Sequence, residues 1–457
     1  MNPGTIVHRL VPAALRSSAG DALGGLLKLG IWGAADQAVL SISNFVTLIL
    51  VARAVGPKEF GNYSLALTFV LFAMSIQAAL LNKPYVVLSA ARQTEAATRE
   101  YVTSVLWGQV AFSIIVNAAA VPAAYIAYLH GRSELSGLLV MAGLVVFAWG
   151  LQEYIRQVLY VERRMKDAVL NDVISYFGQL FLVLLAWKLG VLTPVLAFGL
   201  IALTSFVATV YGLKQIRHSI QPRVSLRAFW SDGVENWRFG RWMLGAAILL
   251  GTVDLAYVWL VAGFVSVAAA GALRAVTAVM GPTHILLKTM DSTLTPIAAR
   301  TAQREGAPGI RRLVFRMFLV TGAPMLGWCV FVSVSSGRLL DFLYGSEYAA
   351  YAWLLPLGAL SYAIGYSNRV IGIALVGRQV PQALFHSQVA QSVFFWTIGL
   401  AATYQFGLEG AALTMVGASF TQALVLFRAY RSDTKPDNRL SVTEMMLAFR
   451  TNTGGLQ

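Results

Sequence analysis

The chain has 457 residues, of which 57% are hydrophobic and only 12% are charged, and its mean hydropathy is +0.65. A water-soluble domain of this size cannot hide so much apolar surface, so the composition excludes a soluble protein and predicts a polytopic membrane protein. The net charge of +14 would suggest a nucleic-acid partner in a soluble protein, but here we expect Lys and Arg to mark cytoplasmic loops.

Residues 1–27 form the first expected element, an amphipathic or loosely ordered cytoplasmic leader. They contain basic residues and scattered apolar ones, without the continuous apolar core and small-residue cleavage site of a secretory signal peptide. We therefore expect the leader to stay on the chain.

Twelve apolar segments follow, and about 20 apolar residues are enough to cross the hydrocarbon core of a bilayer. Several segments are rich in Gly and Ala, which lets helices approach closely in lipid. The sequence therefore predicts an all-α membrane protein with about 12 transmembrane helices. The expected segments are 28–54, 62–82, 102–128, 136–158, 169–188, 192–213, 241–262, 267–290, 313–336, 350–376, 383–404 and 409–430.

The loops between these segments indicate an orientation. If the N-terminus is cytoplasmic, 27 of the 35 Lys and Arg residues fall in inside stretches and five fall outside. Because cytoplasmic loops collect Lys and Arg, this bias places both termini in the cytoplasm and supports an even number of segments. We expect a multi-pass protein of a bacterial inner membrane, with no nucleic-acid partner.

The longest connection, 214–240, divides the chain. It mixes basic residues with aromatic ones, a composition that fits a helix lying at the cytoplasmic lipid surface. On either side we expect a six-helix lobe, 28–213 and 241–430, and after the second lobe a cytoplasmic tail, 431–457.

The two lobes share a faint repeat. Leu50-Val51-Ala52 leads to Gly61 in the first lobe, and Leu260-Val261-Ala262 leads to Gly271 in the second, at a constant offset of 210 residues. Two related lobes predict a pseudo-symmetric pair around a central cavity, as in transporters that work by alternating access.

Several functions leave no trace in the sequence. There is no P-loop pattern for ATP, and the five His residues and the single Cys329 show no metal-ligand spacing. The polar stretches are too short for a catalytic domain, since domains rarely fall below about 50 residues. We therefore expect no enzyme activity, no cofactor and no metal.

Two motifs carry a family resemblance. The first connection runs Leu50-Val51-Ala52-Arg53-Ala54-Val55-Gly56-Pro57-Lys58-Glu59-Phe60-Gly61-Asn62-Tyr63, and Leu343-Tyr344-Gly345-Ser346-Glu347-Tyr348 precedes the tenth segment. This pattern resembles the polysaccharide-exporting flippases, including the O-antigen and exopolysaccharide flippases, of the multidrug/oligosaccharidyl-lipid/polysaccharide exporter superfamily. With the twelve segments and the basic connection, the resemblance covers nearly the whole chain.

The resemblance implies a V-shaped pair of six-helix lobes that moves a polyprenyl-diphosphate-linked glycan to the periplasmic leaflet. The chain is also similar to the lipid II flippases, whose cavity is basic. It lacks their arginine cluster in its first two segments and has Asp36 in the first. No residue roles are therefore carried over from them.

Charged residues inside the apolar segments are the candidate site. Asp254, Arg274, Lys288 and Asp291 lie in or at the ends of the seventh and eighth segments. A charge in a membrane is costly, so such residues usually face a bundle interior or a wet cavity. The alternative is that they neutralise each other and fix helix packing. Asp254 and Arg274 lie at matched depths, which allows a salt bridge.

Two further patterns concern these charges. Arg274 and Lys288 are 14 residues apart, nearly four helical turns or about 21 Å, so they share a face, with an expected kink at Gly281-Pro282 between them. Lys288 could instead snorkel to the interface. Asp36 and Arg369 lie at similar depth in opposite lobes, which suits a contact made in one conformation and broken in the other.

We thus expect a flippase for polyprenyl-diphosphate-linked oligosaccharides in exopolysaccharide, capsule or O-antigen biosynthesis. Arg274, Lys288 and Arg369 are the predicted substrate-binding residues, and Asp36, Asp254 and Asp291 the predicted gating or coupling residues. The expected partners are the lipid-linked glycan, membrane lipids, and a polysaccharide polymerase with its export machinery. The alternative is a cation-coupled multidrug exporter of the same fold; a membrane-embedded glycosyltransferase or polymerase would need a large periplasmic loop.

Overall fold

The computed structural model describes residues 16–433 except 90, 91, 93, 222, 224, 255, 379 and 381. Within helices, the side chains of 16–38, 242, 246, 249, 250, 252–254, 285, 288, 289, 291–293, 296 and 433 are outside the described part. In the first half of the chain the helices are α2 (Arg16–Gln77), η2 (Ala78–Asn82), α3 (Lys83–Leu88), α4 (Glu95–Leu129), α5 (Ser133–Val161), α6 (Met165–Asp172), η4 (Val173–Phe177), α7 (Gly178–Lys188) and α8 (Pro194–Gln215).

The second half is equally helical. Its elements are α9 (Leu226–Asp254), α10 (Ala256–Phe264), α11 (Val267–Val279), α12 (Gly281–Val320), α13 (Gly322–Val334), α14 (Ser336–Tyr344), η5 (Ser346–Tyr351), α15 (Leu354–Gly377), α16 (Gln382–Phe394), η6 (Phe395–Gly399) and α17 (Leu400–Asp433). The described residues form no strand, which confirms the all-α prediction.

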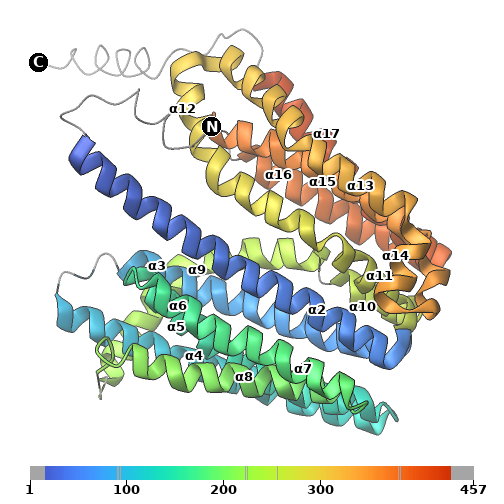
Figure 1. The fold of residues 1–457 in the computed structure, drawn as a ribbon, viewed down its shortest axis with the longest axis horizontal. Helices are drawn as coiled ribbons and strands as arrows, with labels where there is room; N and C mark the ends of the chain where they lie inside the picture. Colours follow the sequence, from blue (N-terminus) through green and yellow to red (C-terminus); the bar gives the residue numbers. More distant parts are fainter. Residues whose placement is uncertain are drawn as a thin grey trace, which may run out of the picture.

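Helix α2 is two membrane passes joined by a sharp turn. The apolar helix Val39–Leu88 holds 50 residues, which at 1.5 Å each would extend about 75 Å, far more than the roughly 30 Å hydrocarbon core. The chain turns back at Gly56 (φ +73°), a backbone conformation open to glycine because it has no Cβ. Figure 1 shows the turn at the right-hand end, where the sequence motif Gly56-Pro57 predicts it.

Eight described helices are long and apolar enough to cross a membrane. Two of them, Val39–Leu88 and Gln382–Ser432, hold about 50 residues each, and the second is interrupted at Gly407 (φ +58°). The seventh and eighth expected segments correspond to α9–α10 and to α11 with the start of α12, where several side chains lie outside the described residues. The structure is therefore consistent with twelve passes.

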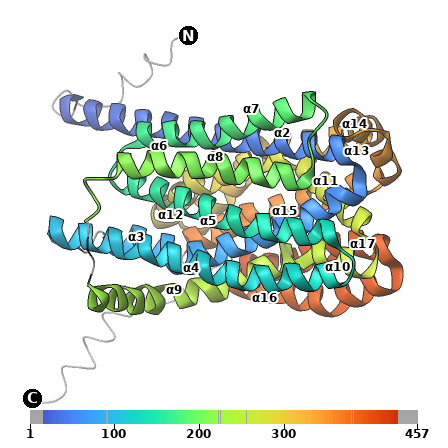
Figure 2. The same ribbon diagram turned by 90° about the horizontal axis from the view of Figure 1, so that it is seen from below.

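The helices pack as two lobes. In the first lobe α5 packs against α4 and α8, and α2 lies along α5 and α7; in the second, α15 packs against α12, α13 and α17. Figure 1 shows the lobes side by side, with the turn of α2 close to α10, α11 and α14, and in Figure 2 the first lobe lies in front of the second. At the opposite end, the start of α2 and α12 diverge (Figure 1). This arrangement confirms the predicted two-lobed fold.

The lobes meet through two glycines. A Cβ on Gly61 would lie 1.9 Å from the carbonyl oxygen of Val267, and a Cβ on Gly271 would lie 2.4 Å from that of Pro57. Small residues let helix backbones approach this closely in a membrane. Gly61 and Gly271 are the repeat-related pair in the sequence, so the equivalent positions of the two lobes touch each other.

Aromatic rings surround this contact and come from the two sequence motifs. Phe60 lies 6.5 Å from Tyr344 and 6.3 Å from Tyr348, measured between ring centroids. All three side chains are buried, and the carboxylate of Glu347 lies against the turn at Gly56. Offset and edge-on pairs at such distances contribute about 0.5–1.5 kcal/mol each beyond burial. The two motifs, nearly 300 residues apart, therefore form one interface between the lobes.

The connection between the lobes is helical from Leu226 onward. Residues Leu226–Asp254 form one continuous helix, α9, so its first turns continue without a break into the seventh segment. Arg92 binds α9 through Asp232 (3.1 Å) and Glu235 (2.7 Å), and the hydroxyl of Tyr101 donates to Asn236 (2.6 Å). Burial raises the pKa of the Asp232 carboxyl above its usual range. The first half of α9 is thus bound to the first lobe.

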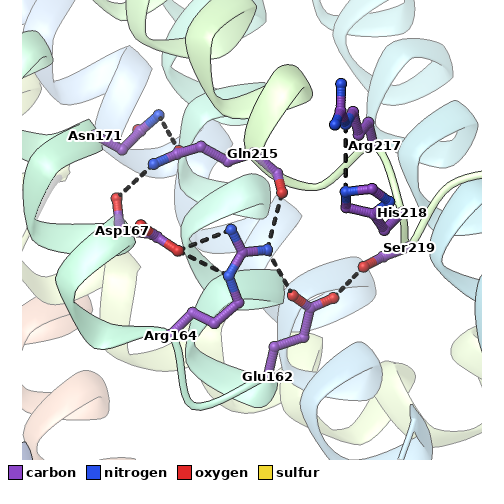
Figure 3. Close-up of polar contacts among 8 residues, drawn as sticks. All are labelled: Glu162, Arg164, Asp167, Asn171, Gln215, Arg217, His218 and Ser219. Atoms are coloured by element: carbon purple, nitrogen blue, oxygen red, sulfur yellow. Dashed lines mark hydrogen bonds and ion pairs between the residues drawn. The ribbon is translucent and has the colours of Figure 1, made fainter.

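Polar contacts hold the turn between α5 and α6, as Figure 3 shows. Arg164 forms ion pairs with Glu162 (3.2 Å) and Asp167 (2.8 Å), and it donates to the carbonyl oxygen of Gln215 (2.8 Å). Ser219 donates to Glu162. Burial opposes the charge of Arg164, but the hydrogen bonds that it donates to Asp167 and Glu162 raise its pKa above the usual value. These contacts tie the end of α8 to the α5–α6 turn.

Gly61→Ala should destabilise the lobe contact. The added Cβ would meet a backbone oxygen, which no side-chain rotation can move, and overpacking of this kind costs about 1–3 kcal/mol. We expect a lower Tm and faster maleimide labelling of a cysteine at Ala272, which is 1% exposed, in a Cys329→Ala background.

The matched control is Gly199→Ala in α8, because a Cβ there meets nothing within 4 Å. It should leave both the Tm and the labelling rate unchanged. Wild-type behaviour of Gly61→Ala would show that the close contact is not needed to hold the lobes together.

Candidate functional site

The candidate site is centred on Arg274 in α11. Ser266 caps this helix by accepting a hydrogen bond from the amide of Ala269 (3.0 Å). Arg274 lies seven residues after Val267, about 10 Å along the axis. Because Gly271 holds α11 against the second pass of α2, the arginine lies close to the plane where the lobes meet.

Tyrosines from three other helices surround Arg274. The guanidinium interacts electrostatically with Tyr63 of α2, Tyr344 of α14 and Tyr362 of α15. Its Nε is buried and has no hydrogen-bond partner among the described residues, and the same holds for the Tyr344 hydroxyl. An unpaired buried N–H group costs about 1–3 kcal/mol, so this arrangement favours a partner that accepts hydrogen bonds.

His284 extends this polar group towards α12. Its Nε2 lies 3.2 Å from the Tyr362 hydroxyl, and the two rings are 5.5 Å apart. The His284 side chain is exposed. Together Arg274, the tyrosines and His284 present cationic and hydroxyl donors, which suit a phosphate or diphosphate because a guanidinium can bind such groups bidentately.

The structure places the other predicted site residues as follows. Arg369 lies on α15 with an exposed side chain. Asp36 belongs to the first pass of α2, Asp254 is the last residue of α9, and Lys288 and Asp291 belong to α12. The side chains of these four are outside the described residues, so the pairs Asp254–Arg274 and Asp36–Arg369, and the face shared by Arg274 and Lys288, stay predictions.

The expected kink in the eighth segment is a break between two helices. Helix α11 ends at Val279, and α12 begins at Gly281 with Pro282 in its first turn. Proline is well accommodated there because the first amides of a helix have no partner within it. A Cβ at Gly281 would lie 3.9 Å from Phe45 of α2, so the break occurs where the two lobes still touch.

A buried polar network in the first lobe was missed by sequence reasoning. Arg156 forms an i,i+3 ion pair with Glu153 (2.7 Å) and also lies 3.5 Å from Asp172, which is fully buried. Gln152 donates to Asp172 (2.5 Å). Deeper in the lobe, Gln77, Gln109 and Asn82 are linked by hydrogen bonds. Polar groups in lipid must find partners inside the protein, and this network supplies them.

Two helical lobes that meet at one end, with apolar helices long enough to cross a bilayer, define a multi-pass membrane protein. The profile of the family described as polysaccharide biosynthesis protein matches residues 50–352, about two thirds of the chain. This protein therefore belongs to that family.

One similar protein is the succinoglycan biosynthesis transport protein ExoT of Rhizobium meliloti (strain 1021). It is 28% identical over 336 residues, which cover 70% of this chain and 63% of the relative. The matched part therefore spans less than two thirds of that relative's length.

Solved structures share the fold. The lipid II flippase MurJ in an inward closed conformation aligns over 93% of both chains with a TM-score of 0.69 and 13% identity. A MATE family multidrug resistance transporter in an inward-facing conformation aligns over 86% of this chain and 94% of its own, with a TM-score of 0.65 and 13% identity. At this identity the likeness concerns the fold alone.

The role of Arg274 can be separated from simple charge pairing with Asp254. If Arg274 only neutralises Asp254, Arg274→Ala leaves an unpaired carboxylate, which lowers the folding stability by about 3–5 kcal/mol. The double variant Asp254→Asn/Arg274→Gln should then regain both abundance and transport. If Arg274 binds the substrate's anionic group, as we expect, the double variant reaches the membrane at normal abundance and still fails to transport.

Arg274→Lys is the conservative control: it keeps the charge but loses the planar fork, so partial activity is expected. Abundance is measured by immunoblot of membranes and transport in proteoliposomes. Full transport by an abundant double variant would make Arg274 a packing charge.

Proposed function

We propose that this protein flips a polyprenyl-diphosphate-linked oligosaccharide from the cytoplasmic to the periplasmic leaflet of a bacterial inner membrane, for polysaccharide biosynthesis. The observation that carries this proposal is Arg274, which lies among tyrosines of both lobes with an Nε that has no hydrogen-bond partner among the described residues. Family membership supports it, as do the named roles of ExoT and MurJ. In this role the chain acts as a transporter and not as an enzyme.

The two lobes suit alternating access. They touch through Gly61, Gly271 and the ring cluster of Phe60, Tyr344 and Tyr348 at one end, and they diverge at the other (Figure 1). A substrate entering from the open end would place its diphosphate against Arg274, with Lys288 and Arg369 nearer that end. The glycan would pass between the lobes while the lipid tail stays in the bilayer.

A cation-coupled multidrug exporter is the second candidate because a MATE transporter shares the fold. Such a function favours a net acidic site for cationic drugs. The described centre has a guanidinium and neutral tyrosines instead, and the electrostatics of that centre therefore favour an anionic substrate.

The function is tested in proteoliposomes that carry a fluorescent polyprenyl-diphosphate-linked oligosaccharide. The reconstituted protein should move the glycan across the bilayer, measured as its loss of protection from a membrane-impermeant reagent, and the Arg274→Ala protein should not. Ethidium efflux by the same vesicles without glycan movement would favour the drug exporter and contradict the proposal.

Orientation is tested separately by reporter fusions. The bias of 27 inside to five outside basic residues supports cytoplasmic termini, so fusions after Arg431 should be active only with reporters that work in the cytoplasm. Alkaline phosphatase activity at that position would invert the topology.

The inner gate is tested by cysteine pairs. Asp36 and Arg369 lie at matched predicted depth in opposite lobes, so Asp36→Cys/Arg369→Cys in a Cys329→Ala background should cross-link during transport, and reduction should restore activity. Absence of a cross-link under apo, substrate-loaded and energised conditions would remove these two residues from the gate.

A further inference from the structure

A groove with apolar walls lies in the second lobe, and Arg274 is not among its lining residues. Helices α12, α15 and α17 enclose a groove of about 380 Å³, in the range of known ligand pockets. Its walls are almost entirely apolar, including Phe318, Ile371, Leu424 and Phe427. All of its lining residues belong to the second lobe, so the groove is separate from the plane where the lobes meet.

Each of the three helices carries a stripe that ends in an arginine. On α12 the stripe is Arg311, Val314 and Phe318; on α15 it is Ser367, Ile371 and Arg378; on α17 it is Phe420, Leu424, Phe427 and Arg431. These spacings of three, four and seven residues place each arginine on the same face as the groove residues of its helix. In every stripe the arginine lies seven residues, about 10 Å, from an apolar lining residue.

The arginines gather at one end of the groove. Tyr430, which lines the groove, interacts electrostatically with both Arg311 and Arg378. The guanidinium of Arg431 lies 4.4 Å from the ring centre of Phe427, another lining residue. The groove therefore has arginines at one end, next to an apolar stretch about two helical turns long.

The apolar walls face outward. The side chains of Phe420, Leu424 and Phe427 are exposed. On the surface of a membrane protein, exposed apolar side chains contact lipid. Basic pockets between transmembrane helices bind anionic lipid head groups, and each Lys or Arg near the membrane surface contributes about 1 kcal/mol to that attraction. The charge and shape of the groove together match a ligand with one phosphate attached to one hydrocarbon chain.

We propose that this groove binds an anionic phospholipid of the surrounding leaflet, with its phosphate at Arg311, Arg378 and Arg431 and one acyl chain along α15 between α12 and α17. The phospholipid is favoured over the tail of the transported substrate because none of the described residues of the first lobe lines the groove, while the substrate path proposed above lies between the lobes. A bound lipid would fix α12 and α17 to α15 and so stabilise the second lobe as a unit.

The test uses full-length protein in nanodiscs of phosphatidylcholine containing a minor fraction of phosphatidylglycerol. After extraction into detergent, native mass spectrometry should show phosphatidylglycerol retained in preference to phosphatidylcholine. The triple variant Arg311→Gln/Arg378→Gln/Arg431→Gln should lower this retention by about tenfold or more. Ala423→Trp, which fills the groove and leaves all charges in place, should lower it too.

The matched control is Arg316→Gln, because Arg316 is an exposed arginine on α12 that does not line the groove; it should retain the lipid as the wild type does. Equal retention of both lipids, or wild-type retention by the triple variant, would contradict the proposal. Displacement of the phospholipid by farnesyl diphosphate, lost in the triple variant, would assign the groove to a polyprenyl substrate and overturn it as well. The Tm of each variant shows whether it is folded. If the triple variant is misfolded, lipid retention is compared between the wild type and the single variants Arg311→Gln and Arg431→Gln instead.

Discussion

The close approach of two helix backbones at Gly61 and Gly271 holds the two lobes together. In lipid there is little hydrophobic force between helices, so van der Waals contact over a closely fitted surface has to hold them together. The glycines bring α2 and α11 within carbonyl contact, and the rings of Phe60, Tyr344 and Tyr348 fill the space around them. The position of Arg274 near the other lobe depends on this fit.

Much of the fold follows from composition and local pattern. Apolar segments of sufficient length predicted the helices, Gly56-Pro57 predicted the turn in α2, and Gly281-Pro282 predicted the break before α12. These features depend on residues close in sequence. The repeat at Gly61 and Gly271 also marked the right pair of positions, although nothing in the pattern itself shows that the two glycines touch.

Contacts between residues far apart in the chain could not be predicted from the sequence. Tyr63 and Tyr344 stand in the two family motifs, but their nearness to Arg274 depends on how three helices pack. Asp172 was overlooked because it lies beside Asn171 at the start of a predicted segment, where a solvated carboxylate is the ordinary expectation. Its burial beside Arg156 arises only when α5 and α6 pack together. The predicted pairs of Asp36 and Asp254 need side-chain positions that lie outside the described residues.

Helix α9 is a stiff connection between the two lobes. Its first turns are fastened to the first lobe by Arg92 and Tyr101, and the close fit of Gly240 on Ala79 continues that attachment, yet its far end leads through α10 into the second lobe. A helix resists sharp bending unless its ladder of hydrogen bonds is interrupted. Because Leu226–Asp254 is one unbroken helix, α9 acts as a stiff lever that would transmit a displacement of the first lobe to the second.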